Sequence, residues 1–469
     1  MTTYHLTCLA CGHRVADFGV WFASGQCCPA CGSPRADVVY DRSYADLVPL
    51  LTPGPVDSFW YYSDFLPTVD RDRVVSFGEG TPPLERWSWL EQRAEREFGV
   101  RCQVAVARND LNGGTHTFKD VAASMAASLF RQHGVDHFVV ASTGNIATAY
   151  ATYLARAGVQ LTAFVPDGNN QASVEAIRQI GQDVVVVDGS YADAKQAAAE
   201  AAAEHGWLIS AGNIDPIRVE SKRTMVFEFF RQLGRMPDVY VQAVSGGTGP
   251  IAVDKAVREL TPHWDEISQA IVRPTTTGAS ANDDHGLVGD PGQVRHLGTD
   301  TPSRDGSTLA ADRSLLRAAQ TAAPTDLHLP RIILTQLDTC DPMVQGWETA
   351  LASGFPDGWE QHYPVIDQPQ TMVTTLATGN PGMFPILAPI VRRSGGTYLR
   401  TREGEVLAEA RRVYQARRLV LGPASIVCLL GFIAALAAGQ IHDGDLVVLN
   451  TGEGVDRAPD FAAQVRQAT

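Results

Sequence analysis

Residues 138–168 read FVVASTGNIATAYATYLARAGVQLTAFVPDG, and this stretch decides the fold class. It starts with a short apolar run, turns at STGN, continues through a helical segment that includes Tyr150 to Ala157, and returns to a second apolar run. Short β-rich runs that alternate with helical segments of ten or more residues indicate βαβ units around a parallel sheet. The stretch therefore predicts an α/β fold.

The same alternation continues on the C-terminal side. A helical segment around residues 173–180, the run VVVVDG, an alanine-rich segment at 191–205 and the run WLIS follow in turn. A second series of apolar runs contains YVQAV, RIILTQ and DLVVLN. We therefore predict two lobes with mainly parallel sheets. Residues 274–324 are polar and lack steady periodicity, so we expect a tolerated surface insertion there, with a lid as the alternative.

Composition excludes several classes of protein. The chain has 469 residues, with 38 Lys and Arg against 52 Asp and Glu, which gives a net charge of −14. An acidic surface of this kind repels nucleic acid and anionic membranes. The longest apolar run, residues 426–438, is shorter than the ~20 residues of a membrane span, so we expect a buried helix. The first residues also lack the pattern of a secretory signal, and we expect a cytoplasmic protein without a nucleic-acid or membrane partner.

Cysteines concentrate at the N-terminus. Five of the eight lie in the first 31 residues, as CLACG and CCPACG, and 16 residues separate the two CxxC pairs. This spacing is typical of a structural zinc site with four thiolate ligands. The alternative is a pair of disulfides, which a reducing compartment disfavours. We expect residues 1–45 to form a zinc ribbon, with Cys27 as a spare thiol. The predicted zinc ligands are Cys8, Cys11, Cys28 and Cys31.

Lysine is rare in this chain, and one lysine differs from the others. The four lysines are Lys119, Lys195, Lys222 and Lys255. Lys195 belongs to a helical segment rich in Ala, Asp and Glu and Lys255 to an amphipathic one, so both are expected to be solvated, whereas Lys222 is either a surface charge or an anion contact. Lys119 follows the loop NGGTHTF and opens an apolar run that is predicted to be helical. A helix N-terminus and apolar surroundings both lower the pKa of an ammonium group, and a lysine tuned in this way forms Schiff bases.

Three further turns indicate which cofactor the Lys119 amine binds. Residues 142–145 lie between a predicted strand and a helix, where free backbone N–H groups bind a carboxylate. Residues 245–250, SGGTGP, follow the run YVQAV, and their glycines allow the backbone to close around a phosphate. Residues 450–454, NTGEG, offer a hydroxyl at the end of the last predicted strand. The cofactor that needs an amine, a phosphate cradle and a ring-nitrogen partner together is pyridoxal phosphate.

At these residues the chain resembles the fold-type II pyridoxal-phosphate enzymes, and within them the threonine synthase group. The segments GEGTPPLE, THTFKD, ASTGN, the glycine loop and LGPAS occur in the order usual for that group, over about residues 75–455. RMPDVYVQAVSGGTG, a TQ followed by DPMVQGW, and DGDLVVLN are similar to one branch of it, cysteate synthase. The resemblance implies a homodimer. It also implies a larger cofactor-binding lobe from residues 46–120 and 240–469, and a smaller lobe from residues 121–239.

The resemblance also implies roles for single residues. Lys119 binds the cofactor as a Schiff base and moves the α-proton, Asn145 contacts the phenolic oxygen, the glycine loop holds the phosphate, and Thr451 faces the pyridine nitrogen. A neutral hydroxyl at that nitrogen favours elimination and replacement over transamination. The predicted cofactor contacts are Lys119, Asn145, Ser245, Gly246, Gly247, Thr248, Gly249 and Thr451. The predicted substrate contacts are Ser142, Thr143, Gly144 and His116.

Some positions depart from the usual pattern of the group. The chain has Gly114 and His116 before the lysine, Val121 after the aspartate, and Ile146 after the asparagine. Substrate preference is therefore not inherited with the resemblance. For the leaving phosphate or an entering anion, the candidates are His116, Arg108, Lys222 and Arg223, and Ser425 is a further candidate hydroxyl.

The leading hypothesis is β-replacement on O-phospho-L-serine through an aminoacrylate intermediate, with sulfite as the nucleophile and L-cysteate as the product. The first alternative is threonine synthase, acting on O-phospho-L-homoserine. A second alternative is a non-catalytic scaffold that binds the cofactor. A ribbon that binds nucleic acid is disfavoured because residues 1–45 contain few basic side chains.

Overall fold

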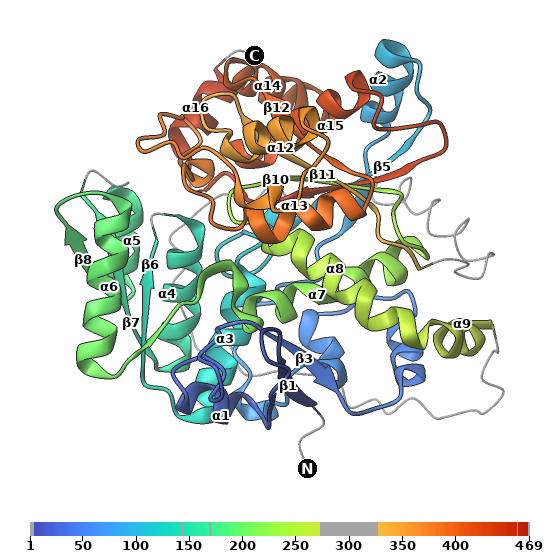
Figure 1. Ribbon diagram of the computed structural model, residues 1–469. Helices are drawn as coiled ribbons and strands as arrows, with labels where there is room; N and C mark the ends of the chain where they lie inside the picture. Colours follow the sequence, from blue (N-terminus) through green and yellow to red (C-terminus); the bar gives the residue numbers. More distant parts are fainter. Residues whose placement is uncertain (1–3, 143, 168–170, 273–326, 457, 468–469) are drawn as a thin grey trace.

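The computed structural model describes residues 4–142, 144–167, 171–272, 327–456 and 458–467, and these residues form two parallel sheets and a small antiparallel one (Figure 1). The predicted insertion at residues 274–324 lies outside the described residues.

The larger parallel sheet has six strands in the order β12-β11-β10-β13-β5-β4, and only β4 is antiparallel to its neighbour. Side chains alternate between its two faces, because Val239 and Val241 belong to one apolar core and Tyr240 to the other. The strands are β4 (Leu84–Arg86), β5 (Gln103–Arg108), β10 (Val239–Ala243), β11 (Arg331–Leu337), β12 (Thr397–Thr401) and β13 (Leu446–Thr451).

Helices cover both faces of this sheet, as expected for parallel strands that are buried on both sides. One face packs against α2 (Ser88–Phe98), α14 (Val406–Arg417), α15 (Pro423–Ala437) and α16 (Pro459–Arg466). The other packs against α8 (Thr248–Leu260), α12 (Pro342–Ala352) and α13 (Phe384–Arg393). Helix α15 contains most of the longest apolar run and is buried along most of its length, as predicted. Within the described part of the chain, no helix is long and apolar enough to cross a membrane.

The smaller sheet is fully parallel, with the order β8-β7-β6-β9. Its strands are β6 (His137–Ala141), β7 (Gln160–Pro166), β8 (Asp183–Val187) and β9 (Leu208–Ile209). Helix α4 (Asn145–Ala157) covers one face and α6 (Tyr191–His205) the other, while α5 (Gln171–Gln179) packs beside α4 and β8. Two further helices, α3 (Asp120–His133) and α7 (Pro216–Leu233), pack against each other next to this lobe, and α7 also packs along α8.

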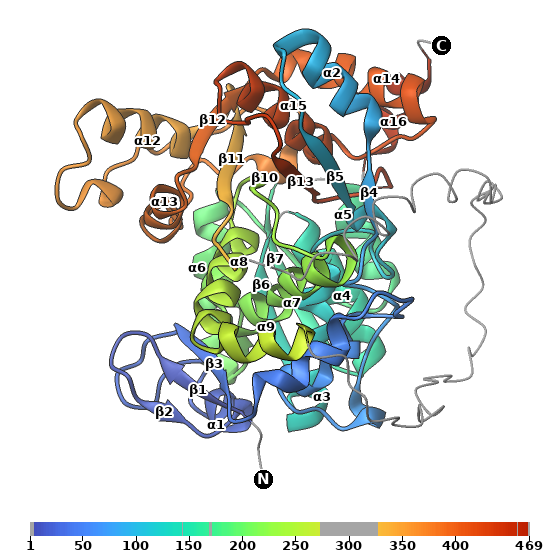
Figure 2. The same cartoon turned by 90° about the vertical axis from the view of Figure 1, so that its right-hand side faces the viewer.

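The N-terminal module has the strand order β2-β1-β3, from β1 (Tyr4–Cys8), β2 (Arg14–Val15) and β3 (Ala36–Tyr40), with the short helix α1 (Phe18–Ala23). It docks on the C-terminal end of α3, where the ring of Phe22 lies 5.2 Å from that of Phe130. It also reaches α7, because the Tyr40 hydroxyl donates to Glu220 at 2.7 Å. Figure 2 shows this module at the opposite end of the molecule from α2 and α14, and helix α9 (Trp264–Val272) lies beside α8.

The predicted fold class, two lobes with mainly parallel sheets, is confirmed. The expectation that Lys255 is solvated is wrong, because its side chain is 3% exposed and pairs with Glu220 and Glu259. Helix α8 buries a polar face at this position, and the carboxylates of Glu220 on α7 and Glu259 on α8 compensate the charge of Lys255.

Candidate active site

Lys119 lies where β13 and the start of α3 meet. The Phe118 N–H donates to the Gly452 carbonyl at 3.0 Å, and Thr117 forms a bridge with Glu453. The buried Asp120 carboxylate accepts hydrogen bonds from the Thr115 N–H, the Thr115 hydroxyl and the Thr117 N–H at 2.7–2.9 Å. Burial raises the pKa of Asp120 to about 7, although these hydrogen bonds oppose the shift. The loop before Lys119 is therefore fixed by its backbone pairing with Gly452 and Glu453 and by hydrogen bonds to Asp120, the first residue of α3.

The Lys119 side chain has the electrostatic character of a nucleophilic amine. Burial lowers its pKa to about 8, the positive charge of Arg218 adds to the shift, and Glu453 opposes it. At neutral pH about a tenth of such amines are unprotonated, compared with about one in 3,000 at the pKa of a free lysine. The amine is therefore able to attack a carbonyl group.

The predicted phosphate cradle connects β10 to α8. Gly247 has φ +75°, which only glycine adopts readily, and it begins the helix. A Cβ atom at Gly246 would lie 2.2 Å from Asn213 Nδ2, and one at Gly249 would lie 2.3 Å from Gln242 Oε1. Among the described residues, the backbone N–H groups of 245–249 find no acceptor. Free N–H groups at a helix N-terminus, in a loop that excludes side chains, form an anion site.

The turn between β6 and α4 contributes the second anion-binding loop. The Gly144 N–H donates to the Ser142 hydroxyl at 3.2 Å, and Gly144 precedes the first turn of α4. Asn145 is 7% exposed; its Nδ2 atom donates to Glu453 at 2.6 Å and its Oδ1 atom is buried without a partner. Thr143 lies outside the described residues. Among the described residues, the turn leaves one amide oxygen, Asn145 Oδ1, that a ligand can satisfy, and its contact with a substrate carboxylate stays a prediction.

Two predicted contacts have partners of their own in the protein. The Thr451 hydroxyl donates to the Ala107 carbonyl on the neighbouring strand β5, so its oxygen is left to accept. The Ser425 hydroxyl donates to the Glu453 carbonyl at 2.7 Å and accepts from the Glu453 N–H at 3.0 Å, so it fixes the loop after β13. The His116 side chain is about half exposed, and the residue has φ +59°. Its Nδ1 atom lies 3.8 Å from Asp456 Oδ2.

The cationic side chains divide into two groups. Arg108 pairs with Glu85 and Asp110, and Arg223 pairs with Glu220 and Glu259, so both of these sequence candidates stabilise the fold. By contrast, neither Lys222 nor Arg218 forms an ion pair with any described residue, although they are 2% and 6% exposed.

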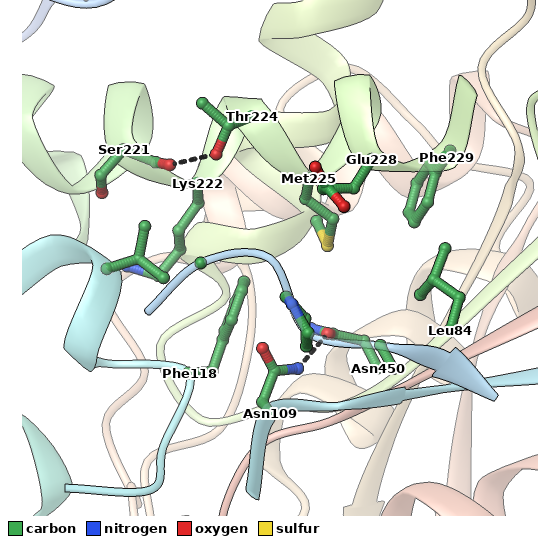
Figure 3. A pocket seen from close by; sticks show the side chains of 14 residues that line it. Leu84, Asn109, Phe118, Ser221, Lys222, Thr224, Met225, Glu228, Phe229 and Asn450 are labelled. Atoms are coloured by element: carbon green, nitrogen blue, oxygen red, sulfur yellow. Dashed lines mark hydrogen bonds between the residues drawn. The ribbon is translucent and has the colours of Figure 1, made fainter. Parts of the chain in front are cut away.

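Arg218 and Lys222 project from the first turns of α7 toward Lys119. The Arg218 guanidinium is fixed by two hydroxyl groups, those of Tyr150 at 3.0 Å and Ser210 at 2.5 Å. Lys222 makes one long contact of 3.4 Å to the Arg218 carbonyl and lies over the ring of Phe118. Figure 3 shows Lys222 beside Phe118, above a cavity of about 20 Å³ that also borders Asn109 and Asn450.

The electrostatic surroundings of Lys222 disfavour its protonated form. Burial lowers the pKa of Lys222 well below its usual value, and the charges of Lys119 and Arg218 lower it further. The charge of Asp215 opposes these effects only in part. The sequence suggested Lys222 as an anion contact; it did not single out Arg218, Asn213 or Glu453, because nothing local distinguishes an arginine, asparagine or glutamate that faces a site.

The comparisons with known proteins identify the family. The family model described as pyridoxal-phosphate dependent enzyme matches residues 75–310, which is half of the chain. This chain belongs to the pyridoxal-phosphate-dependent enzymes. Members of the family catalyse elimination and replacement reactions, and this chain is an enzyme of that class.

Relatives and solved structures agree with this assignment. Threonine synthase of Mycobacterium tuberculosis strain H37Rv is 24% identical over 404 residues, which cover 86% of this chain and 88% of that protein. Threonine synthase of Methanosarcina acetivorans is 25% identical over 454 residues, which cover 96% and 91% of the two chains. The fold is similar to that of processed threonine deaminase isoform 2 from Solanum lycopersicum, with a TM-score of 0.55, 16% identity, and coverage of 89% of this chain and 90% of that one.

The residues of the site fit pyridoxal phosphate. Lys119 supplies a buried amine of lowered pKa, residues 245–249 supply free N–H groups in a loop without side-chain bulk, and Asn145 supplies an unpaired amide oxygen. When bound, the cofactor withdraws electrons from the amino acid's α-carbon and so makes its proton acidic. Lys119 would be the base that moves that proton, and the turn that contains Ser142, Gly144 and Asn145 would orient the carboxylate.

The four predicted metal ligands come together in the N-terminal module. Their sulfur atoms all lie within 4.8 Å of one another, and the Cys8–Cys31 and Cys11–Cys28 pairs are 3.6 and 3.7 Å apart. Four thiolates around zinc, at ~2.3 Å from the metal, are separated by about 3.8 Å. Cys27 is excluded from the cluster and donates to the Ser24 carbonyl, as expected of a spare thiol. The group is therefore able to bind zinc.

Proposed function

We propose that this enzyme removes phosphate from an O-phosphorylated L-amino acid and then joins a nucleophile to the remaining carbon chain. The observation that carries the proposal is the pair of buried basic side chains, Arg218 and Lys222, which lie near Lys119 and form no ion pair with a carboxylate of the described residues. A buried charge is costly unless an opposite charge compensates it, and a phosphate monoester is a dianion that two such cations stabilise.

The first candidate substrate is O-phospho-L-serine, with sulfite as the nucleophile. The segments similar to cysteate synthase favour it, and the departures at Gly114, His116, Val121 and Ile146 argue against simple inheritance of the usual substrate of threonine synthases. The second candidate is O-phospho-L-homoserine, which the relatives named threonine synthase favour.

Each phosphate of the reaction then has its own site. The glycine loop at 245–249 holds the phosphate of the cofactor, and Arg218 with Lys222 hold the phosphate that leaves the substrate. The turn that contains Ser142, Gly144 and Asn145 orients the substrate carboxylate. Zinc bound by the four cysteines of the N-terminal module, a homodimeric assembly and a cytoplasmic location complete the proposal.

Release of inorganic phosphate, measured with each phospho-amino acid, tests the proposal. We expect release from O-phospho-L-serine, with a sulfonated product when sulfite is added. A Lys222→Met variant is expected to lose about 10- to 100-fold in kcat/KM, which corresponds to one charge-assisted hydrogen bond. Lys195→Met is the matched control, because Lys195 is exposed on α6.

The outcomes separate the alternatives. Release from O-phospho-L-homoserine alone identifies the threonine synthase reaction. Release from neither compound refutes a phosphate leaving group. Equal losses in Lys222→Met and Lys195→Met show that the buried cation does not contact the substrate.

A further inference from the structure

Two hydroxyl groups of the smaller lobe hold the Arg218 guanidinium. Its Nε atom donates to the Tyr150 hydroxyl of α4 at 3.0 Å, and its Nη2 atom donates to the Ser210 hydroxyl, just after β9, at 2.5 Å. The guanidinium carbon also lies 5.3 Å from the centre of the Tyr150 ring, in the position of a cation–π contact. Among the described residues, none accepts a hydrogen bond from Arg218 Nη1, so this nitrogen stays available to a ligand.

These contacts decide how the two hydroxyl protons can be used. A guanidinium group has donors only, so both hydroxyl oxygens accept from Arg218 and each hydroxyl keeps its own proton to donate. Ser210 accepts a second hydrogen bond from the Gly212 N–H at 3.3 Å. Within the described part of the chain, no acceptor takes the proton of either hydroxyl. Tyr150 is 0% exposed, and a buried donor without an acceptor costs free energy that a ligand with accepting oxygens recovers.

The carboxylate of Asp215, three residues before Arg218, does not fill this role. Its Oδ1 atom accepts from the Ile217 N–H at 2.9 Å, and its buried Oδ2 atom receives no hydrogen bond. The Lys222 ammonium, one turn beyond Arg218 on α7, adds further donors, because its one hydrogen bond is 3.4 Å long. Several donors without acceptors around a positive charge fit a ligand with several negatively charged oxygen atoms, such as a phosphate group.

We propose that Tyr150 and Ser210 bind the substrate phosphate together with Arg218, and that Tyr150 is also the residue that positions the guanidinium. Each hydroxyl accepts from the cation through its oxygen and donates its proton to a phosphate oxygen. The inference rests on the proposed function, because it adds two contacts to the phosphate site proposed there. The phosphate of the cofactor is assigned to residues 245–249, so the two phosphate sites can be tested separately.

Tyr150→Phe tests the proposal, because phenylalanine keeps the ring beside the guanidinium and removes only the hydroxyl. The cofactor-loaded enzyme is used, since its glycine loop is then occupied and added inorganic phosphate reports on the second site. We expect inorganic phosphate to bind about 10- to 30-fold more weakly to Tyr150→Phe than to the natural protein in isothermal titration calorimetry. We expect kcat/KM for the phospho-amino acid to fall by a similar factor. The reaction of β-chloro-L-alanine, whose leaving group is chloride, is expected to be unchanged.

Tyr398→Phe is the matched control. Tyr398 lies on β12 at the edge of the larger sheet, and its hydroxyl is buried without a partner. Loss of this hydroxyl is expected to leave phosphate binding and both reactions unchanged. Ser210→Ala is a second test variant that does not depend on the folding of Tyr150→Phe, and it is expected to weaken phosphate binding about 3- to 10-fold.

The remaining outcomes are decisive. Equal losses with the phospho-amino acid and with β-chloro-L-alanine overturn the proposal, because they show a structural role for Tyr150. No phosphate binding by the natural protein, or unchanged binding in Tyr150→Phe or Ser210→Ala, also overturns it and leaves the proposed function intact if phosphate is still released from a phospho-amino acid. If neither phospho-amino acid releases phosphate but both variants bind inorganic phosphate more weakly, the proposed function fails and the two anion contacts stand.

Discussion

Replacing Lys222 with methionine is expected to make the cofactor-free protein more stable. The Lys222 side chain is 2% exposed, its one hydrogen bond is 3.4 Å long, and Lys119 and Arg218 add positive charge nearby. Phe118, Met225 and Phe229 line the same cavity, so the methionine side chain enters apolar surroundings. Removal of a buried lysine that forms no ion pair with any described carboxylate is expected to raise the free energy of unfolding by about 1–3 kcal/mol.

The pH dependence of this effect follows from the direction of the pKa shift. Burial and the neighbouring cations hold the pKa of Lys222 well below its usual 10.5 in the folded protein. The unfolded chain therefore binds the proton more tightly, and the natural protein gains stability as pH rises from the folded pKa toward about 10.5. The advantage of Lys222→Met is largest near and below neutral pH and shrinks as the pH approaches 10.

Lys255→Met is the matched control, with the opposite expected sign. Lys255 is 3% exposed, but it pairs with Glu220 at 2.7 Å and with Glu259. Its loss leaves two buried carboxylates with Arg223 as their remaining cation, at a cost of about 3 kcal/mol.

Urea unfolding of the two variants and the natural protein, at pH 7 and pH 10, measures both effects. Inorganic phosphate is expected to raise the midpoint of the natural protein more than that of Lys222→Met. If Lys222→Met is destabilised at pH 7 to the same extent as Lys255→Met, then Lys222 is compensated by a charge in the protein and the anion site is refuted.

Three further predictions concern the cofactor and the metal. The rate at which cofactor-free protein binds pyridoxal phosphate is expected to rise with pH and level off above about pH 8. The reason is that burial lowers the pKa of Lys119 to about 8 and only the neutral amine reacts. A stopped-flow pH series measures this rate, and a rate that continues to rise up to pH 10 would contradict the lowered pKa. Gly246→Ala is expected to weaken cofactor binding by at least about tenfold in a fluorescence titration, because the added Cβ would lie 2.2 Å from Asn213 Nδ2. Gly144→Ala is the control, because a Cβ atom there would have no described atom within 4 Å. Cys28→Ser is expected to lower bound zinc from about one per chain to near zero by metal analysis, and Cys27→Ser to leave it unchanged, because only Cys28 belongs to the four-sulfur cluster.

The sequence predicts the elements whose pattern is local. The alternation of apolar runs and helical segments predicts β6, α6 and β13 to within one residue of their observed bounds, because each buries a regular set of side chains. The glycine loop and the CxxC pairs are also visible in the sequence, since their chemistry depends on neighbouring residues. Burial lowers the pKa of Lys119, as its apolar neighbours in the sequence suggest, and the charge of Arg218, which the sequence does not single out, adds to the shift.

Residues that act across the fold are not visible in this way. Lys222 and Lys255 both belong to helical segments, yet one lies near other basic side chains and the other between two carboxylates. Glu453 and Asn145 are 308 positions apart in the chain and meet only when β13 ends beside the turn after β6. Long-range pairing decides the role of such residues, and no local period encodes it.

The charge of the whole chain and the charge of its site have opposite signs, and this contrast supports an anionic substrate. The chain carries a net charge of −14, whereas Lys119, Arg218 and Lys222 lie near one another, and the carboxylates that oppose them among the described residues are Asp215 and Glu453. The N-termini of α4 and α8 also point free N–H groups into the same region. An acidic surface repels anions in general, so a local cationic site has to be maintained for a specific anion. Other deeply buried basic side chains, such as Arg108, Arg223 and Lys255, are paired with carboxylates, so the two that form no ion pair within the described part of the chain indicate where that anion binds.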